Sequence, residues 1–177
     1  MTILVADAVG YSRLMSIDDV ETLAALDGAR GVFRASVQAH GGRVVDMAGD
    51  SVLATFETAT GAVQAALAIQ QRLEGHAHGL PEAQRLRFRI GLHLGDVIEK
   101  ADGTVYGDGV NIAARLQALA APGRVHASHA VVSAVGGRID ARFDDLGEQI
   151  VKNLAQPVRT FSVRGKADPA DVPTAAV

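Results

Sequence analysis

The stretch GGRVVDMAGDSVLATF, residues 41–56, has the pattern of two short apolar strands that meet at a turn around Gly49 and Asp50. Valine, leucine and alanine runs of this length are typical of strands that bury one face, and Gly next to Asp is typical of a turn. The same stretch carries a second carboxylate, Asp46, four residues before Asp50. Burial in a core accounts for the apolar residues of this hairpin but not for its two acids.

The first half of the chain alternates between strand and helix patterns around this hairpin. Residues 2–7 form a β-rich apolar run, and a loop is expected where the run breaks at Gly10. Residues 16–40 place apolar side chains at roughly helical spacing. Residues 59–75 repeat that spacing after the hairpin, and Gly75 is expected to end the second helix.

The second half of the chain continues the alternation in shorter elements. Apolar residues that alternate with arginines and a histidine predict a strand over residues 86–92 with one solvated face. The elements expected after it are a helix over 108–121, a strand over 124–128, a helical segment over 128–135, and two closing strands within 141–153 and 157–165. The order β-α-β-β-α-β with extensions predicts an α+β fold, a ferredoxin-like split βαβ sandwich with helices packed on an antiparallel-rich sheet.

Length and composition are those of one soluble globular domain. The chain has 177 residues, of which 48% are apolar and 21% are charged. We expect residues 1–165 to form this domain, and the Pro- and Ala-rich residues 166–177 to form a flexible tail.

Charge and hydropathy exclude several kinds of partner. A net charge of -3 and a pI of about 6.0 leave no basic surface of the kind that binds nucleic acid. The chain has no cysteine, which fits a reducing compartment, and no apolar run near the roughly 20 residues that a membrane span needs. We therefore expect a cytoplasmic protein with no nucleic-acid or membrane partner.

Two aspartates are expected to lie close together near the end of the first strand. Asp7 ends that strand, and Asp50 lies at the tip of a hairpin that this topology places beside it. The residues after Asp7 can turn several backbone N–H groups toward one point, which suits an anion. Paired carboxylates beside such a group suit a hard divalent cation, Mg²⁺ in particular, that bridges to phosphate. Taken singly, Asp7 has the simpler reading of a strand end and Asp50 that of a turn residue.

Three other side chains suit phosphate chemistry. Asn111 and Arg115 lie four residues apart on a predicted helix and so face the same way. A planar guanidinium and a neutral amide suit the charge on a phosphoryl group in a transition state. Lys152 is a further candidate phosphate partner. Each of these residues, taken singly, is also compatible with an ordinary solvated surface.

Four stretches resemble the class III adenylate/guanylate cyclase catalytic domain in order and spacing. They are ILVADAVGYSRLM, GGRVVDMAGDSVLATF, FRIGLHLGDVI and VYGDGVNIAARLQALAAPGRVHAS, and the closing stretch DLGEQIVKNLAQPVRTFSV is similar as well. The resemblance covers about residues 2–163. It implies a homodimer with two composite sites, each of which makes a 3′,5′-cyclic nucleotide and pyrophosphate from a nucleoside triphosphate.

The resemblance also implies a role for each candidate residue. Asp7 and Asp50 match the two aspartates that bind two Mg²⁺ or Mn²⁺ ions, with the backbone carbonyl of Ala8 as a further ligand. The residues that match the loop holding the triphosphate through backbone amides are Val9, Gly10, Tyr11 and Ser12. The residues that match those contributed by the other subunit are Asn111 for the ribose, Arg115 for the α-phosphoryl transition state and Lys152 for the terminal phosphates.

The base-reading positions depart from the pattern of this family. Asp46 stands where members that use ATP usually have a lysine, and Thr104 stands where they usually have an aspartate. Ionised Asp46 cannot donate to N1 of adenine, but it can accept from N1–H and the amine of guanine. Thr104 can accept from the amine of adenine or donate to O6 of guanine. Asp46 can also point into solvent.

These observations leave three functions to compare. ATP is the substrate we expect first, because the sequence as a whole looks most like bacterial adenylate cyclases, and a guanylate cyclase is the alternative. A catalytically degenerate domain that binds nucleotide or a partner is the third. A diguanylate cyclase is disfavoured, because the chain has no Gly-Gly-(Asp/Glu)-Glu-Phe signature.

Overall fold

The computed structural model describes residues 1–166 and 168. Strands and helices alternate over these residues in the expected way. In chain order they are β1 (Thr2–Val9), α1 (Tyr11–Ile17), α2 (Asp19–Ala39), β2 (Gly42–Asp46), β3 (Ser51–Phe56), α3 (Ala59–Ala77), a 3-10 turn (Glu82–Gln84), β4 (Arg87–Leu94), β5 (Ile98–Glu99), β6 (Val105–Tyr106), α4 (Asp108–Leu119), β7 (Val125–Ser128), α5 (His129–Val135), β8 (Ala141–Gln149) and β9 (Val158–Gly165).

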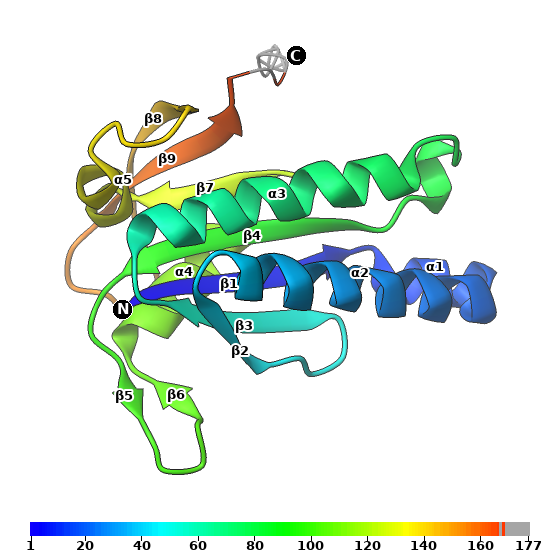
Figure 1. Cartoon of the computed structure of the whole chain (residues 1–177), viewed down its shortest axis with the longest axis horizontal. Coiled ribbons are helices and arrows are strands. Elements are labelled where there is room, and N and C mark those ends of the chain that lie inside the picture. The colour runs from blue at the N-terminus through cyan, green and yellow to red at the C-terminus, as the bar shows by residue number, and fades with distance from the viewer. Residues whose placement is uncertain (167, 169–177) are drawn as a thin grey trace.

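One sheet of seven strands forms the centre of the molecule, in the order β2-β3-β1-β4-β7-β9-β8 (Figure 1). Every neighbouring pair is antiparallel except β4 and β7, which are parallel. The short strands β5 and β6 form a separate hairpin that projects away from the sheet (Figure 1). The predicted α+β fold with an antiparallel-rich sheet is therefore confirmed.

Helices cover the two faces of the sheet unequally. Alternate residues of β1 point to opposite faces, and Leu4, Ala6 and Ala8 join the main core with residues of α2, α3 and α5. Phe33 of α2 meets Phe88 of β4 edge to face in this core, with ring centroids 5.1 Å apart. Among the helices of the described residues, α4 packs on the other face, against β1, β4 and β7, and we call this the α4 face.

Gly91 of β4 allows the close approach of α4 to the sheet. A Cβ atom at this position would lie 2.1 Å from the carbonyl oxygen of Ala113 and 2.4 Å from the amide nitrogen of Gln117. Both of these atoms belong to the backbone of α4, so only glycine fits beneath the helix.

Four local predictions were wrong. The first strand was expected to end at Asp7, but β1 continues to Val9. The loop expected at Gly10 is helix α1, which follows β1 after a single left-handed residue, Gly10, with φ of 71°. The helix expected from residue 16 begins instead at Asp19, because the Asp18 carboxylate caps it by accepting from the amide of Glu21. Gly75 does not end α3, which continues to Ala77. The predicted flexible tail lies outside the described residues, apart from Lys166 and Asp168.

Candidate functional site

Asp7 and Asp50 lie next to each other on the α4 face. Asp7 is opposite Ser51 in the β1–β3 ladder, and the Ser51 hydroxyl donates to the Asp7 carboxylate at 2.8 Å. The amide of Ala8 donates to the backbone oxygen of Asp50 at 3.2 Å. The expected convergence of the two acids is therefore present within one chain.

The surroundings of Asp7 disfavour its negative charge. Partial burial raises the pKa of the Asp7 carboxyl, and the nearby Asp50 charge raises it further, while the Ser51 hydrogen bond and the Arg89 charge oppose the shift. A bound cation would relieve both of the unfavourable effects, because it supplies charge where two carboxylates repel each other.

Arg89 is a residue of this site that the sequence analysis missed. It lies opposite Asp7 in the β1–β4 ladder, and its Nε atom is buried with no hydrogen-bond partner among the described residues. The alternation of residues 86–92 places Arg89 on one face of its strand, but the pattern alone indicates only a solvated face. The register with Asp7 is what connects Arg89 to the site.

Helix α2 braces the turn that carries Asp50. The guanidinium of Arg30 donates to the backbone oxygen of Gly49 at 2.5 Å. The turn itself closes through the amide of Ser51, which donates to the oxygen of Ala48 at 3.1 Å. The backbone beside Asp50 is thus held by an element from the opposite side of the sheet.

The four residues matched to the triphosphate loop are the end of a strand, a helix cap and a first helical turn. Val9 ends β1, Gly10 is the N-cap of α1, and Tyr11 and Ser12 begin that helix. Leu14 donates to the oxygen of Gly10, which is the first hydrogen bond of the helix. The amides before Leu14 have no partner within α1 and are available to an acceptor.

A β-bulge places Asp46 on the α4 face. Arg43 is opposite Thr55 and Val44 is opposite Ala54, but the next pair is Asp46 with Leu53, which leaves Val45 as the extra residue. Without the bulge, Asp46 would fall on the same face as Val44, which packs against the main core. Asp46 is exposed at this position, two strands away from β1.

Thr104 lies in the turn between β5 and β6, and Arg43 ties this hairpin to β2. The guanidinium of Arg43 donates to the Glu99 carboxylate at 2.7 Å and to the oxygen of Gly103 at 3.4 Å. Thr104 follows Gly103 directly. The two predicted base-reading residues thus come from elements that one arginine joins.

Asn111 and Arg115 lie outside the buried face of α4 that packs on the sheet. The residues of α4 that face the sheet include Ala113 and Leu116, whereas Asn111 and Arg115 are exposed. Lys152 is also exposed, in the connection from β8 to β9. The strand β8 lies four strands from β1, roughly 19 Å at the usual strand spacing. Among the described residues, no hydrogen bond or ion pair joins Asn111, Arg115 or Lys152 to Asp7 or Asp50.

The candidate site is an open surface of the described chain. A pocket of about 620 Å³ opens between α3, the start of β4 and the end of β9, and none of the predicted site residues lines it.

Among residues 1–166 and 168, no three His, Cys, Asp or Glu side chains gather as a metal-binding cluster. No helix in the same part of the chain is long and apolar enough to cross a membrane.

Comparison with known proteins identifies the family. Residues 1–165 match the Adenylate and Guanylate cyclase catalytic domain. The chain belongs to this family. It is therefore a cyclase catalytic domain, from a family of lyases, and the resemblance seen in the sequence is confirmed.

Individual relatives include proteins named for either nucleotide. The chain is 43% identical over 168 residues to "Putative adenylate cyclase 3" of Rhizobium meliloti, an alignment that covers 93% of this chain and 28% of that protein. It is 27% identical to mouse "Guanylate cyclase 2G", over 94% of this chain and 16% of that protein. The cyclase domain thus spans about a quarter or less of these two relatives.

A solved cyclase structure has the same fold as this chain. The crystal structure of "Adenylate/Guanylate Cyclase/Hydrolase" from Silicibacter pomeroyi superimposes with a TM-score of 0.82 and 37% identity, and covers 94% of this chain and 96% of that one. The fold of this cyclase domain and its family are thereby established together.

Proposed function

We propose that this cyclase domain converts ATP to 3′,5′-cyclic AMP and pyrophosphate at two composite sites of a homodimer. The observation that carries the proposal is the Asp7–Asp50 pair, in which partial burial and then the Asp50 charge raise the pKa of Asp7. Two carboxylates held this close on a partly buried sheet surface are suited to hard cations and to the triphosphate that such cations bind.

The donor set fits two Mg²⁺ or Mn²⁺ ions. Asp7, Asp50 and the backbone carbonyl of Ala8 would hold them with oxygen ligands, which both metals prefer. When bound, the ions would neutralise the triphosphate and favour the ionised form of the ribose 3′-oxygen that attacks the α-phosphorus.

Groups around the two aspartates are placed to hold the phosphates. The backbone amides from Val9 to Ser12 follow Asp7 at the junction of β1 and α1 and would donate hydrogen bonds to phosphate oxygens. Arg89 adds a positive charge beside Asp7, and its Nε atom has no partner among the described residues. These groups would fix the leaving pyrophosphate in line with the attacking oxygen.

The partner subunit would complete each site. Asn111 would position the ribose, Arg115 would stabilise charge on the α-phosphoryl group in the transition state, and Lys152 would bind the terminal phosphates. Their exposure supports a role across an interface.

Asp46 and Thr104 would read the base, and they leave GTP as the alternative substrate. The β-bulge keeps Asp46 on the α4 face, where its carboxylate can accept from N1–H and the amine of guanine. That observation favours a guanylate cyclase. The hydrogen bond from Thr104 to Asp102 favours ATP.

The purified protein should be incubated with Mn²⁺ and either ATP or GTP, and the cyclic product measured. The proposal expects cyclic AMP as the main product from wild type and none from Asp50→Ala. If neither nucleotide gave product while the protein was a dimer, the domain would be a degenerate one that binds without turnover. More cyclic GMP than cyclic AMP would instead establish the alternative substrate.

A further inference from the structure

The hydroxyl proton of Thr104 is used in a hydrogen bond to Asp102 of the same turn. The Thr104 hydroxyl and the Thr104 amide both donate to the Asp102 carboxylate, the amide at 2.9 Å. A threonine hydroxyl has one proton and two lone pairs, so a Thr104 that donates to Asp102 offers only lone pairs to any other group.

Asp102 is suited to keep this arrangement at neutral pH. The two hydrogen bonds from Thr104 lower the pKa of the Asp102 carboxyl, with the hydroxyl as the larger cause. The carboxylate therefore stays ionised and cannot donate back to the threonine oxygen. Thr104 is held as an acceptor, although threonine in general can serve as donor or acceptor.

The surrounding turn holds Thr104 in place. The amide of Lys100 donates to the backbone oxygen of Thr104, and the amide of Gly103 donates to the backbone oxygen of Lys100, both at 2.9 Å. The Lys100 ammonium lies 4.6 Å from the centre of the Tyr106 ring, across the hairpin. With Arg43 bonded to Glu99 and Gly103, the turn is joined to both its own hairpin and β2.

We propose that Asp102 is a positioning residue that fixes Thr104 as a hydrogen-bond acceptor, so that the base site selects a 6-amino purine over a 6-oxo purine. This inference rests on the proposed function, which assigns Thr104 to base recognition. An acceptor facing the exocyclic amine of adenine is paired, whereas the same acceptor facing the 6-oxo group of guanine or hypoxanthine meets another acceptor.

The inference also gives Asp46 a place in a site for adenine. The 6-amino group carries two hydrogens, so two acceptors can share it, and Asp46 does not need to reach N1. A 6-oxo purine could still donate N1–H to Asp46, but its carbonyl would remain unpaired beside Thr104. The Asp102–Thr104 pair is therefore what decides between the two bases.

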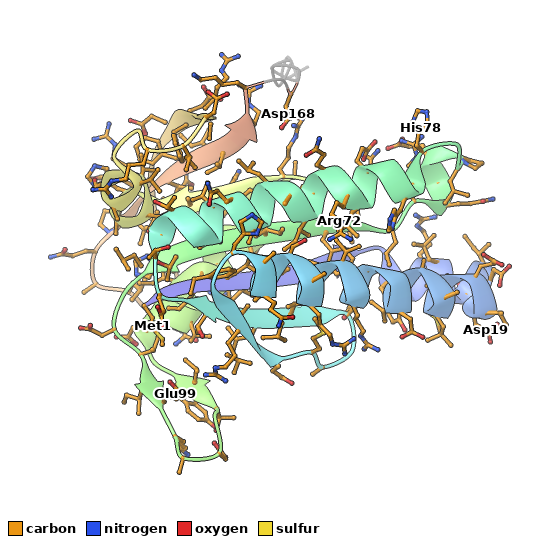
Figure 2. All side chains as sticks on the ribbon, in the orientation of Figure 1. Met1, Asp19, Arg72, His78, Glu99 and Asp168 are labelled. Atoms are coloured by element: carbon orange, nitrogen blue, oxygen red, sulfur yellow. The ribbon has the colours of Figure 1, made fainter. Side chains whose placement is uncertain are left out.

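ATP and ITP isolate the group in question, because they differ only at the purine 6-position and the adjacent N1 proton. Displacement of a fluorescent nucleoside triphosphate in Mn²⁺ gives the ratio of their dissociation constants without requiring turnover. Four variants should be compared with wild type: Asp102→Ala, Asp102→Asn, Thr104→Val and, as a control, Asp19→Ala. Asp19 lies on α2, at the end of the molecule opposite to Glu99 and its hairpin (Figure 2).

Wild type should bind ATP about tenfold or more tightly than ITP, as expected for one mispaired polar group in the base site. Asp102→Ala should reduce this ratio by at least about threefold, because the freed hydroxyl can rotate and donate. Thr104→Val should lose the preference as well. Asp102→Asn keeps an acceptor oxygen and should retain most of the preference, and Asp19→Ala should retain all of it.

Two results would overturn the inference alone: an unchanged ratio in Asp102→Ala, or a wild type that makes cyclic product but binds ATP and ITP equally. Failure of wild type to bind either nucleotide would overturn both this inference and the proposed function. Melting curves of the variants check that Asp102→Ala folds. Asp102→Asn and Thr104→Val test the same claim with side chains of nearly the same shape as those they replace.

Discussion

Asp7 is the residue on which the chemistry of the site depends most directly. Its raised pKa shows that the fold holds a carboxylate where the ionised form is disfavoured, beside a second carboxylate. Such a position stabilises nothing by itself and is typical of a functional site. Stability and activity should therefore respond in opposite directions when its charge is removed.

We predict that Asp7→Asn abolishes cyclase activity without destabilising the fold. Activity should fall about 100-fold or more, because several kcal/mol of metal-derived transition-state stabilisation are lost. A carboxyl whose pKa is raised by folding disfavours the folded state above its ordinary value of 3.8, so the neutral variant should melt at the same or a higher temperature in EDTA. The same change at exposed Asp19 should leave activity unchanged; a lower melting temperature for Asp7→Asn would contradict the electrostatic account.

We predict that replacing Arg115 preserves the stability of the fold but lowers the turnover number. Arg115→Lys keeps the positive charge but not the planar pair of donors, so we expect the turnover number to fall at least about tenfold. Exposed Arg34 on α2 provides the control, since Arg34→Lys should change neither turnover nor stability. Equal turnover in wild type and Arg115→Lys would remove Arg115 from the proposed transition state.

The individual residues of the site could be predicted only in part. Asp7 and Asp50 could be paired from sequence, because the last part of the first strand and a hairpin tip fall together in this topology. Arg89 could not, because its relation to Asp7 depends on the register of β1 with β4. The face of Asp46 depends on a bulge at Val45, and no residue in GRVVD signals a bulge.

At the scale of elements, the position of α4 on the sheet depends on Gly91. Gly91→Ala would force a Cβ atom into the α4 backbone, so we expect a loss of about 1–3 kcal/mol in the free energy of unfolding, or more. Displacement of α4 should also lower the cyclase activity of the protein, because α4 carries Asn111 and Arg115. Denaturant unfolding and product formation measure the two effects.

Gly28 is a matched control for Gly91, because the same substitution there should raise the free energy of unfolding. Gly28 lies inside α2 with nothing within 4 Å of where a Cβ atom would be. Gly28→Ala should therefore stabilise the protein by about 0.5–1 kcal/mol through helix propensity alone. If both substitutions destabilised the protein equally, the close packing of α4 on Gly91 would not be the cause.

His93 connects β4 to β7 beneath α4 and should make stability depend on pH. Its Nδ1 atom lies 2.8 Å from the Ser128 hydroxyl oxygen, and burial lowers its pKa below 6.5. The folded state then binds fewer protons than the unfolded state, so the free energy of unfolding should fall as the pH drops below 6.5, until the lowered pKa is reached. His93→Asn should have a flatter profile between about pH 7.5 and pH 5.5; parallel profiles would contradict this assignment.

Most helices and strands could be predicted from local sequence patterns. The exceptions are places where the start or end of a helix depends on its capping residue or on a single glycine. Periodicity located α2, α3 and α4 to within a few residues. Helix α1 was missed because its seven residues are too short to show periodicity, and its start depends on the left-handed conformation of Gly10. Gly75 was misread as a helix end because glycine lowers helix propensity without forbidding a helix.

The groups assigned to the proposed site lie on several elements of the molecule. The Asp7–Asp50 pair lies near the end of β1 and the turn before β3, while Asn111 and Arg115 are exposed on α4 and Lys152 is exposed between β8 and β9. A sequence can give the residue types of such a site but not their division between subunits, because that division depends on the assembly. The central claim is therefore that each active site takes its aspartates from one chain and its arginine from the other.

Complementation of two inactive variants tests this claim most directly. Asp50→Ala and Arg115→Ala should each be inactive as homodimers, with wild-type melting curves. When the two are co-expressed in equal amounts, half of the dimers should be mixed, and each mixed dimer holds one intact site of two. The account predicts recovery of about one quarter of the wild-type activity per chain. Mixed dimers that form but make no cyclic product would contradict it.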